Sequence, residues 1–353
     1  MRFVLLVLFL LASCLGLPAG AQERHFNYSV KTLSQDNGLS QGSNYFRYED
    51  SKGFVWITGN DALNRYDGAT IKVYNLNRYF KDCAPLQQGY GFAEDDKSNV
   101  YIGSVNGLYI YHRKKDKFTL QKIYNGEENL AMPFAFKNGK IWCFNRKYEI
   151  AAYDVVSGRI YYLLKVPLPA INSVHVYDML GPDGISFYYR FPFFDNYNRL
   201  WIFGTQTTYT FHMHKKLLQQ VVLNVFKKNK ALILCTSFDK SRNELLIGTD
   251  KGLVMYRMNT GQERFIQSVG RTPIGEVNSI ACKGDAIALR NASGSLFTDW
   301  KFGRYCWTRH PSRLFSRRVY DFGFDKAGRL WMCEDGLGQA IYRFFQPLFP
   351  KVP

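Results

Sequence analysis

One short pattern returns seven times along this chain of 353 residues, and it constrains the fold more than any other feature. Its clearest copy is a D-x-x-G turn at residues 50–53, followed by an apolar run centred on Trp56 and a second run at residues 62–66. Such an order of turn and apolar runs is typical of consecutive strands in a β-meander. The central residues of the seven copies are Trp56, Tyr101, Trp142, Trp201, Leu246, Ala288 and Trp331.

The spacing of these central residues is that of a propeller blade. Successive copies lie 45, 41, 59, 45, 42 and 43 residues apart, and four short strands account for each interval. Stacked blades bury faces that no single blade could bury alone. We therefore predict an all-β fold, a single seven-bladed β-propeller of four-stranded blades, with repeats over about residues 30–345 and a degenerate sixth copy.

A ring of blades has to be closed, and an alternating segment at residues 26–33 (FNYSVKTL) precedes the first copy of the pattern. We predict that this segment is the outer strand of the seventh blade, where it would pair with the strand containing Tyr342. The pairing would remove an exposed sheet edge that otherwise invites aggregation.

The first 21 residues are typical of an export signal. Arg2 precedes an apolar run at residues 3–11, and small residues lead to Ala21. We expect cleavage near Ala21, a propeller domain over residues 22–353, and a periplasmic or secreted protein. Residues 11–14 (LASC) are also similar to a lipobox, so the alternative is a lipoprotein anchored through Cys14. No later stretch reaches 18 uninterrupted apolar residues, so none is expected to span a membrane.

Charge and cysteine content narrow the function classes. The formal charge of +17 would suggest nucleic acid, but export argues against that partner. A soluble basic surface or attraction to an anionic glycan or lipid remains. The cysteines form no C-x-x-C pair, so no metal site is predicted. Cys143 and Cys333 lie in apolar runs beside Trp142 and Trp331, where buried free thiols are expected.

The first copy of the pattern also resembles a known family. Residues 38–43 (GLSQGS), 50–59 (DSKGFVWITG) and 62–68 (ALNRYDG) together resemble the two-component regulator propeller repeat. In that family such repeats form the periplasmic ligand-sensing part of hybrid histidine kinases, often recognising carbohydrate breakdown products. The resemblance implies a non-enzymatic sensor propeller at the periplasm or cell surface, with an oligosaccharide ligand.

The chain departs from the family plan, since no kinase or membrane helix follows the last repeat in the sequence. Three arrangements stay open: a stand-alone binding protein, a subunit of a separate membrane transducer or histidine kinase, and a shortened gene product. A homodimer stays open as well.

In a propeller, the connections that lead into the innermost strands emerge around the central channel, and this is the default binding face. Counting back six or seven residues from each turn Asp gives most candidates, and the loops after the second strands add more. The ligand-binding candidates are Asn44, Gln88, Arg146, Tyr148, Tyr188, Tyr189, Arg190, Glu276 and Arg318. Aromatic, amide and Arg side chains suit sugar rings, hydroxyls and carboxylates, although each could also be an ordinary turn residue. Residues 188–190 stand out because they lie in the 59-residue interval.

Two other classes of function compete with the sensor. Streptogramin lyases are similar propellers with D-x-x-G-x-W repeats. An enzyme of that kind needs a cluster of His and Glu side chains on the channel face, and His175 and Glu276 are the only candidates for it in this sequence. His212 and His214 share a strand face without a recognisable third ligand. An exported protein-interaction scaffold is the other alternative. We therefore predict no catalytic residue, no metal and no cofactor.

Overall fold

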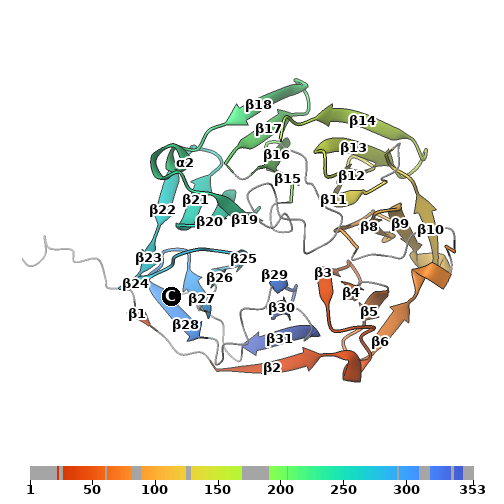
Figure 1. The fold of residues 1–353 in the computed structure, drawn as a ribbon, viewed down its shortest axis with the longest axis horizontal. Helices are drawn as coiled ribbons and strands as arrows, with labels where there is room; N and C mark the ends of the chain where they lie inside the picture. The colour runs from red at the N-terminus through yellow and green to blue at the C-terminus, as the bar shows by residue number, and fades with distance from the viewer. Residues whose placement is uncertain are drawn as a thin grey trace, which may run out of the picture.

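Seven four-stranded antiparallel blades form a ring around a central channel (Figure 1). The structure is a computed structural model. It describes residues 22–23, 27–59, 62–78, 80–81, 89–124, 129–168, 191–204, 206–291, 294–309, 319–334 and 338–344. The predicted fold class and the number of blades are confirmed.

Each blade runs from an innermost strand at the channel to an outer strand at the perimeter. The innermost strands of blades one to seven are β3 (Asn44–Glu49), β7 (Phe92–Glu94), β11 (Met132–Lys137), β15 (Phe193–Phe194), β19 (Ile233–Asp239), β25 (Ser279–Lys283) and β29 (Val319–Phe324). The second strands are β4 (Val55–Gly59), β8 (Val100–Ser104), β12 (Lys140–Phe144), β16 (Arg199–Phe203), β20 (Glu244–Thr249), β26 (Ala286–Asn291) and β30 (Leu330–Glu334). The third strands are β5 (Leu63–Tyr66), β9 (Gly107–His112), β13 (Glu149–Asp154), β17 (Thr208–His212), β21 (Gly252–Arg257), β27 (Gly294–Asp299) and β31 (Gly338–Phe344). The outer strands are β6 (Ile71–Tyr74), β10 (Lys117–Gln121), β14 (Ile160–Lys165), β18 (Leu217–Val221), β22 (Glu263–Ile266), β28 (Arg304–Arg309) and β2 (Tyr28–Leu33).

The described part of the chain has little structure besides the blades. A short helix, α2 (Asn224–Asn229), and a hairpin of β23 (Ser268–Val269) and β24 (Thr272–Pro273) connect neighbouring blades, and three 3₁₀ turns lie at Gln35–Asn37, Leu76–Arg78 and Arg113–Lys115. None of the helices in the described residues is long and apolar enough to cross a membrane.

The ring is closed by the N-terminal strand, as the sequence predicts. β2 pairs antiparallel with β31, with Val30 opposite Tyr342. A further contact was not predicted: β1 (Gln22–Glu23) pairs in parallel with β28 and adds a fifth strand to blade six. The perimeter of the propeller therefore accepts an extended segment as an additional strand.

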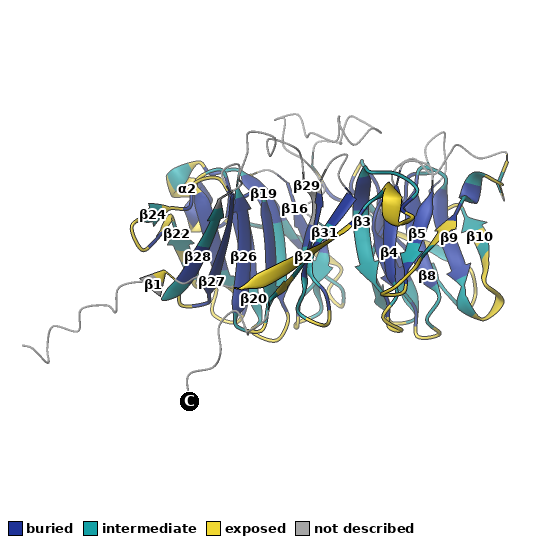
Figure 2. Cartoon of the chain, turned by 90° about the horizontal axis from the view of Figure 1, so that it is seen from below, coloured by how far each residue is buried: buried dark blue, intermediate teal, exposed yellow. Residues whose placement is uncertain are grey.

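The second strands carry the core. Trp56, Trp201 and Trp331 are fully buried, and each packs where two blades meet. Trp56 lies in one cluster with Val100 and Ile102 of the next blade. Trp331 contacts the blade-one cluster in the same way, so the seam between the last and first blades is as well packed as the others. In Figure 2 the buried strands stand side by side, and many of the exposed residues lie in turns along the lower edge.

The turn Asp explains why the pattern includes a Trp. Asp325 is 2% exposed and accepts the indole N–H of Trp331 at 2.8 Å. The pairs Asp50 with Trp56 and Asp195 with Trp201 repeat the bond at the same distance. Burying an indole without a partner for its N–H is costly. Because the Asp and the Trp lie six residues apart, one carboxylate accepts both the backbone N–H groups of the turn and the buried indole N–H.

Candidate functional site

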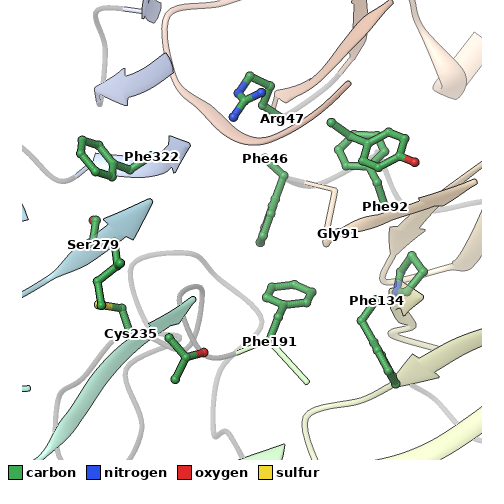
Figure 3. A pocket seen from close by; sticks show the side chains of 13 residues that line it. Phe46, Arg47, Gly91, Phe92, Phe134, Phe191, Cys235, Ser279 and Phe322 are labelled. Carbon is green, nitrogen blue, oxygen red and sulfur yellow. The ribbon is translucent and has the colours of Figure 1, made fainter. Parts of the chain in front are cut away.

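A cavity of about 280 Å³ lies in the central channel. Every blade contributes at least one residue to its lining, from the innermost strand or directly before it (Figure 3). The lining residues are Phe46, Arg47, Tyr48, Gly91, Phe92, Pro133, Phe134, Phe191, Cys235, Thr236, Ser279, Ile280 and Phe322. The ring architecture thus brings residues from distant parts of the sequence to one site.

Blades one to four contribute mainly aromatic rings to the cavity. The ring of Phe191 lies edge-on to Phe46, with centroids 5.5 Å apart, and equally far from Phe144. Gly91 makes room for it: a Cβ at Gly91 would lie 2.9 Å from Cε1 of Phe191 and 2.7 Å from the carbonyl oxygen of Pro133. The backbone at Gly91 has φ +83°, which also favours glycine. The lack of a side chain at Gly91 therefore leaves room for the ring of Phe191 at this position in the channel.

The cavity lining also has polar side chains. Thr236 and Ser279 come from blades five and six, and Arg47 comes from blade one, next to Phe46. The guanidinium of Arg47 lies over the ring of Trp331, 5.3 Å from its centroid. In Figure 3, Ser279 and Phe322 face Phe92 and Phe134 across the cavity. A ligand in this cavity would meet aromatic rings from blades one to four and seven, together with the hydroxyls of Thr236 and Ser279 from blades five and six.

Two buried polar atoms, the Oγ of Ser279 and the Oδ1 of Asn44, have no hydrogen-bond partner among the described residues. Ser279 is 1% exposed and lines the cavity, and its Oγ makes no hydrogen bond. Asn44 is fully buried at the start of β3; its Nδ2 donates to the carbonyls of Gln41 and Gly42, while its Oδ1 accepts nothing. Buried polar atoms in native proteins nearly always have partners, so such atoms require a water or ligand.

Three of the predicted candidates, Asn44, Arg146 and Tyr148, are buried or half-buried in the structure. Asn44 lies beside the channel, as described. Tyr148 is buried, with φ +54°, in one hydrophobic cluster with Tyr45 and Tyr90. Arg146 is half-buried; burial lowers its pKa, which the nearby Tyr90 partly offsets. Tyr148 and Tyr90 thus belong to one hydrophobic cluster, and Tyr90 is near enough to Arg146 to affect its pKa.

Of the remaining candidates, the structure describes Glu276 alone. Glu276 is exposed, three residues before β25. Gln88, Tyr188, Tyr189, Arg190 and Arg318 lie outside the described residues, and so does His175 of the lyase alternative. These assignments stay predictions. In the described part of the chain, no three His, Cys, Asp or Glu side chains form a group able to hold a metal.

The cavity residues could have been found from the same repeat. They lie mostly three or four residues before each turn Asp, as Phe46 and Arg47 do before Asp50 and Phe322 does before Asp325. Counting back six or seven residues, as above, reaches the start of the innermost strand instead. The repeat therefore indicates these positions, but only the structure shows that the side chains three or four residues before the turn Asp line a cavity.

Comparison with known proteins finds partial sequence matches and similar folds. The family "Photosynthesis system II assembly factor YCF48" matches residues 219–344, blades five to seven. The photosystem II assembly protein Ycf48 of Thermosynechococcus vestitus is 31% identical over 71 residues, which are 20% of this chain and 17% of that protein. These matches are too short to assign the whole chain to that family.

Solved structures match over nearly the whole propeller. The extracellular domain of a hybrid two-component system from B. thetaiotaomicron has a TM-score of 0.65 and 17% identity, and the match covers 90% of this chain and 42% of that one. Virginiamycin B lyase from Staphylococcus aureus has a TM-score of 0.65, 13% identity, and coverage of 90% and 99%. Ycf48 bound to a D1 peptide has a TM-score of 0.63, 10% identity, and coverage of 93% and 100%.

These similarities concern the fold. The resemblance to two-component sensor propellers that the sequence indicates is confirmed at that level, and the chain spans less than half the length of the sensor domain it matches. The same architecture is also found in a lyase and in Ycf48. Because one fold supports unrelated functions, the function has to be argued from the site.

Proposed function

We propose that this chain is an exported, non-enzymatic propeller that binds a small carbohydrate in its central channel and acts as the sensory part of a signalling system. The observation that carries the proposal is the mixed lining of the cavity, which combines aromatic rings with hydrogen-bonding side chains. A sugar ring has apolar C–H faces and a rim of hydroxyls. The rings of Phe46, Phe134 and Phe191 suit the faces, and Ser279, Thr236 and Arg47 suit the rim.

The size of the cavity limits the ligand. Its 280 Å³ lies just below the range of about 300 to 1,000 Å³ for pockets of drug-sized ligands. One or two sugar rings would fit, with the rest of any oligosaccharide left outside the channel. The half-buried Arg146, in the connection between β12 and β13, would contact that outer part.

The sensory role is supported by the fold shared with an extracellular domain of a two-component system. Binding would pass on a signal only if the ligand favours one state of the propeller or its interfaces over another. A separate membrane transducer or histidine kinase would receive it.

The proposal is tested by calorimetry of residues 22–353 against neutral and acidic mono-, di- and oligosaccharides, after a thermal-shift screen. Ser279→Ala is the informative variant. Its hydroxyl has no partner among the described residues, so its loss should leave stability unchanged or higher, yet weaken sugar binding about three- to tenfold.

Ser104→Ala is the matched control. Ser104 is also buried, but its hydroxyl donates to the carbonyl of Gly107 at 3.0 Å, away from the cavity. We expect this variant to lose stability and keep its affinity. Failure of every sugar to bind, or unchanged affinity in Ser279→Ala, contradicts the proposal.

A peptide-binding scaffold is the second candidate. It is favoured by the match of blades five to seven to the Ycf48 family and by the similar fold of Ycf48 bound to a D1 peptide. Stable capture of a peptide without any sugar binding would favour it. Conversion of a bound ligand into product in the same samples would instead favour an enzyme related to the lyases.

A further inference from the structure

The outer strand of blade three, β14, has an unusual surface. Tyr161, Tyr162 and Leu163 are consecutive and 41%, 55% and 38% exposed. No other outer strand in the described residues has three large apolar side chains in a row at this exposure. Exposed edge strands are templates for pairing with another chain, and charges, bulges or a covering segment reduce this tendency. β14 has one such bulge at Leu163, where its register against β13 shifts between Ile150 and Ala151.

A groove lies beside this edge. A cavity of about 420 Å³ is lined by residues of β13, β14 and Tyr124 from the preceding connection. Its tyrosines are held in place: Tyr162 donates to the carbonyl of Ile123 at 2.6 Å, and Tyr124 donates to the carbonyl of Glu149 at 2.8 Å. A partner would therefore meet a fixed apolar groove and would not have to order these rings on binding.

Both ends of the edge are basic. Arg159 directly precedes β14 and Lys165 is its last residue; both are exposed and form no ion pair within the described part of the chain. Glu149, opposite Lys165 in the sheet, accepts a hydrogen bond from Asn145 at 2.6 Å. Asp154 is paired with Lys140, 3.2 Å apart. Asp154 thus has an ion-pair partner, whereas Glu149 is bonded to a neutral amide and places its carboxylate opposite Lys165 and in the groove lining. The positive charge that no acidic side chain of the neighbouring strand offsets is that of Arg159.

We propose that the β14 edge binds an extended, acidic peptide segment of a partner protein by strand addition. Backbone hydrogen bonds along the edge would give affinity, and the groove lined by Tyr124 and Tyr162 would take alternate apolar side chains of the peptide. The molecule already contains one such pairing, since β1 lies along the edge of β28 in blade six. The peptide's acidic residues would pair with Arg159 and Lys165.

A second copy of this chain fits the edge less well. Antiparallel pairing of two β14 strands would put Arg159 of one copy beside Lys165 of the other, and like charges opposite one another destabilise a sheet. Each copy also carries a formal charge of +17, which opposes self-association. Charge therefore selects an acidic partner over a homodimer at this edge.

Labelled eight-residue peptides test the proposal by fluorescence anisotropy on residues 22–353. An alternating Glu-Val peptide should bind, and more weakly as salt increases, while a Lys-Val peptide should not. A Glu-Val peptide with N-methylated backbone should bind at least tenfold more weakly, because strand addition needs its N–H groups. Hydrogen exchange should slow within residues 160–165 when the first peptide binds.

The double variant Arg159→Glu with Lys165→Glu should bind the Glu-Val peptide at least tenfold more weakly than the wild type. It should also bind the Lys-Val peptide, which the wild type does not. Its control, Lys215→Glu with Lys216→Glu, makes the same charge change at exposed residues before β18 and should keep Glu-Val binding within twofold. Equal loss in both variants, unchanged binding after N-methylation, or self-association of the free protein through β14 would overturn the proposal.

Discussion

The bond between Asp325 and Trp331 offers the sharpest test of how the repeat stabilises the propeller. In Asp325→Ala the buried indole N–H loses its acceptor, which costs about 1 to 3 kcal/mol. The bond from the Arg329 backbone N–H, 2.8 Å long, contributes about 0.5 to 1.5 kcal/mol. The ion pair with the Arg329 side chain, which is 37% exposed, adds about 0 to 1 kcal/mol. We therefore expect a loss of about 2 to 5 kcal/mol.

This loss can be measured by differential scanning calorimetry. An unfolding entropy of about 2.1 cal/mol/K per residue over about 330 residues gives a fall in Tm of about 3 to 7 °C. The control is Asp96→Ala, an exposed Asp of the blade-two turn, which should leave Tm nearly unchanged. In a Trp331→Phe background the effect of Asp325→Ala should shrink, because no N–H is left unsatisfied.

The same bond predicts a pH dependence. Burial raises the pKa of Asp325, but hydrogen bonds from Trp331 and Arg329 lower it by more. The pKa of Asp325 in the folded protein therefore lies below the usual value for an Asp side chain. The contribution of the carboxylate is therefore complete above the unfolded pKa of about 3.9 and is lost as pH falls through the folded value. The Tm difference between wild type and Asp325→Asn should narrow below about pH 4. A constant difference down to pH 2.5, or equal Tm values at pH 7, would refute the reasoning.

Further predictions concern the channel, the thiols and the ring closure. Gly91→Ala should cost about 1 to 3 kcal/mol of stability, because it forces a positive φ on alanine, and should weaken sugar binding in calorimetry by displacing Phe191. Desolvation raises the pKa of the half-buried Cys282 to about 11, so in Cys83→Ser protein Ellman's reagent should react slowly at pH 8 until denaturant is added; rapid labelling would contradict the raised pKa. A chain starting at Ser34 lacks β2 and should melt earlier and aggregate in size-exclusion chromatography, since β31 would become an open edge. Tyr189→Ala, suggested by the sequence alone, should weaken glycan binding by about 1 to 3 kcal/mol, and unchanged affinity would remove that residue from the site.

Much of the fold could be predicted because its information is local. The turn at residues 50–53 and the strand around Trp56 lie close together in the chain, and the same order returns in other blades. The closing strand could also be predicted, because the alternating pattern of residues 26–33 precedes the first full repeat. The burial of Cys143 and Cys333 as free thiols is likewise confirmed, since residues beside the central Trp share its environment.

The candidate site was harder to predict from the sequence. Counting along the repeat places Asn44 at the rim of the channel; in the structure it is fully buried at the start of β3 and does not line the cavity, so its role in binding stays a prediction. The cavity itself was missed, because its aromatic lining depends on how far Phe191 projects past Gly91, a contact between blades four and two. The added strand β1 was also missed, since two residues carry too little pattern to indicate a pairing.

The sequence by itself determined the number of blades, the order of their strands and the way the ring closes, because each of these follows from turn chemistry and alternation within about 40 residues. Only the tertiary structure decided which side chains meet at the channel axis, which polar atoms are buried without partners, and which outer edge stays apolar and exposed. These properties arise when seven units are stacked in a ring, since contacts between blades join residues that no local pattern relates.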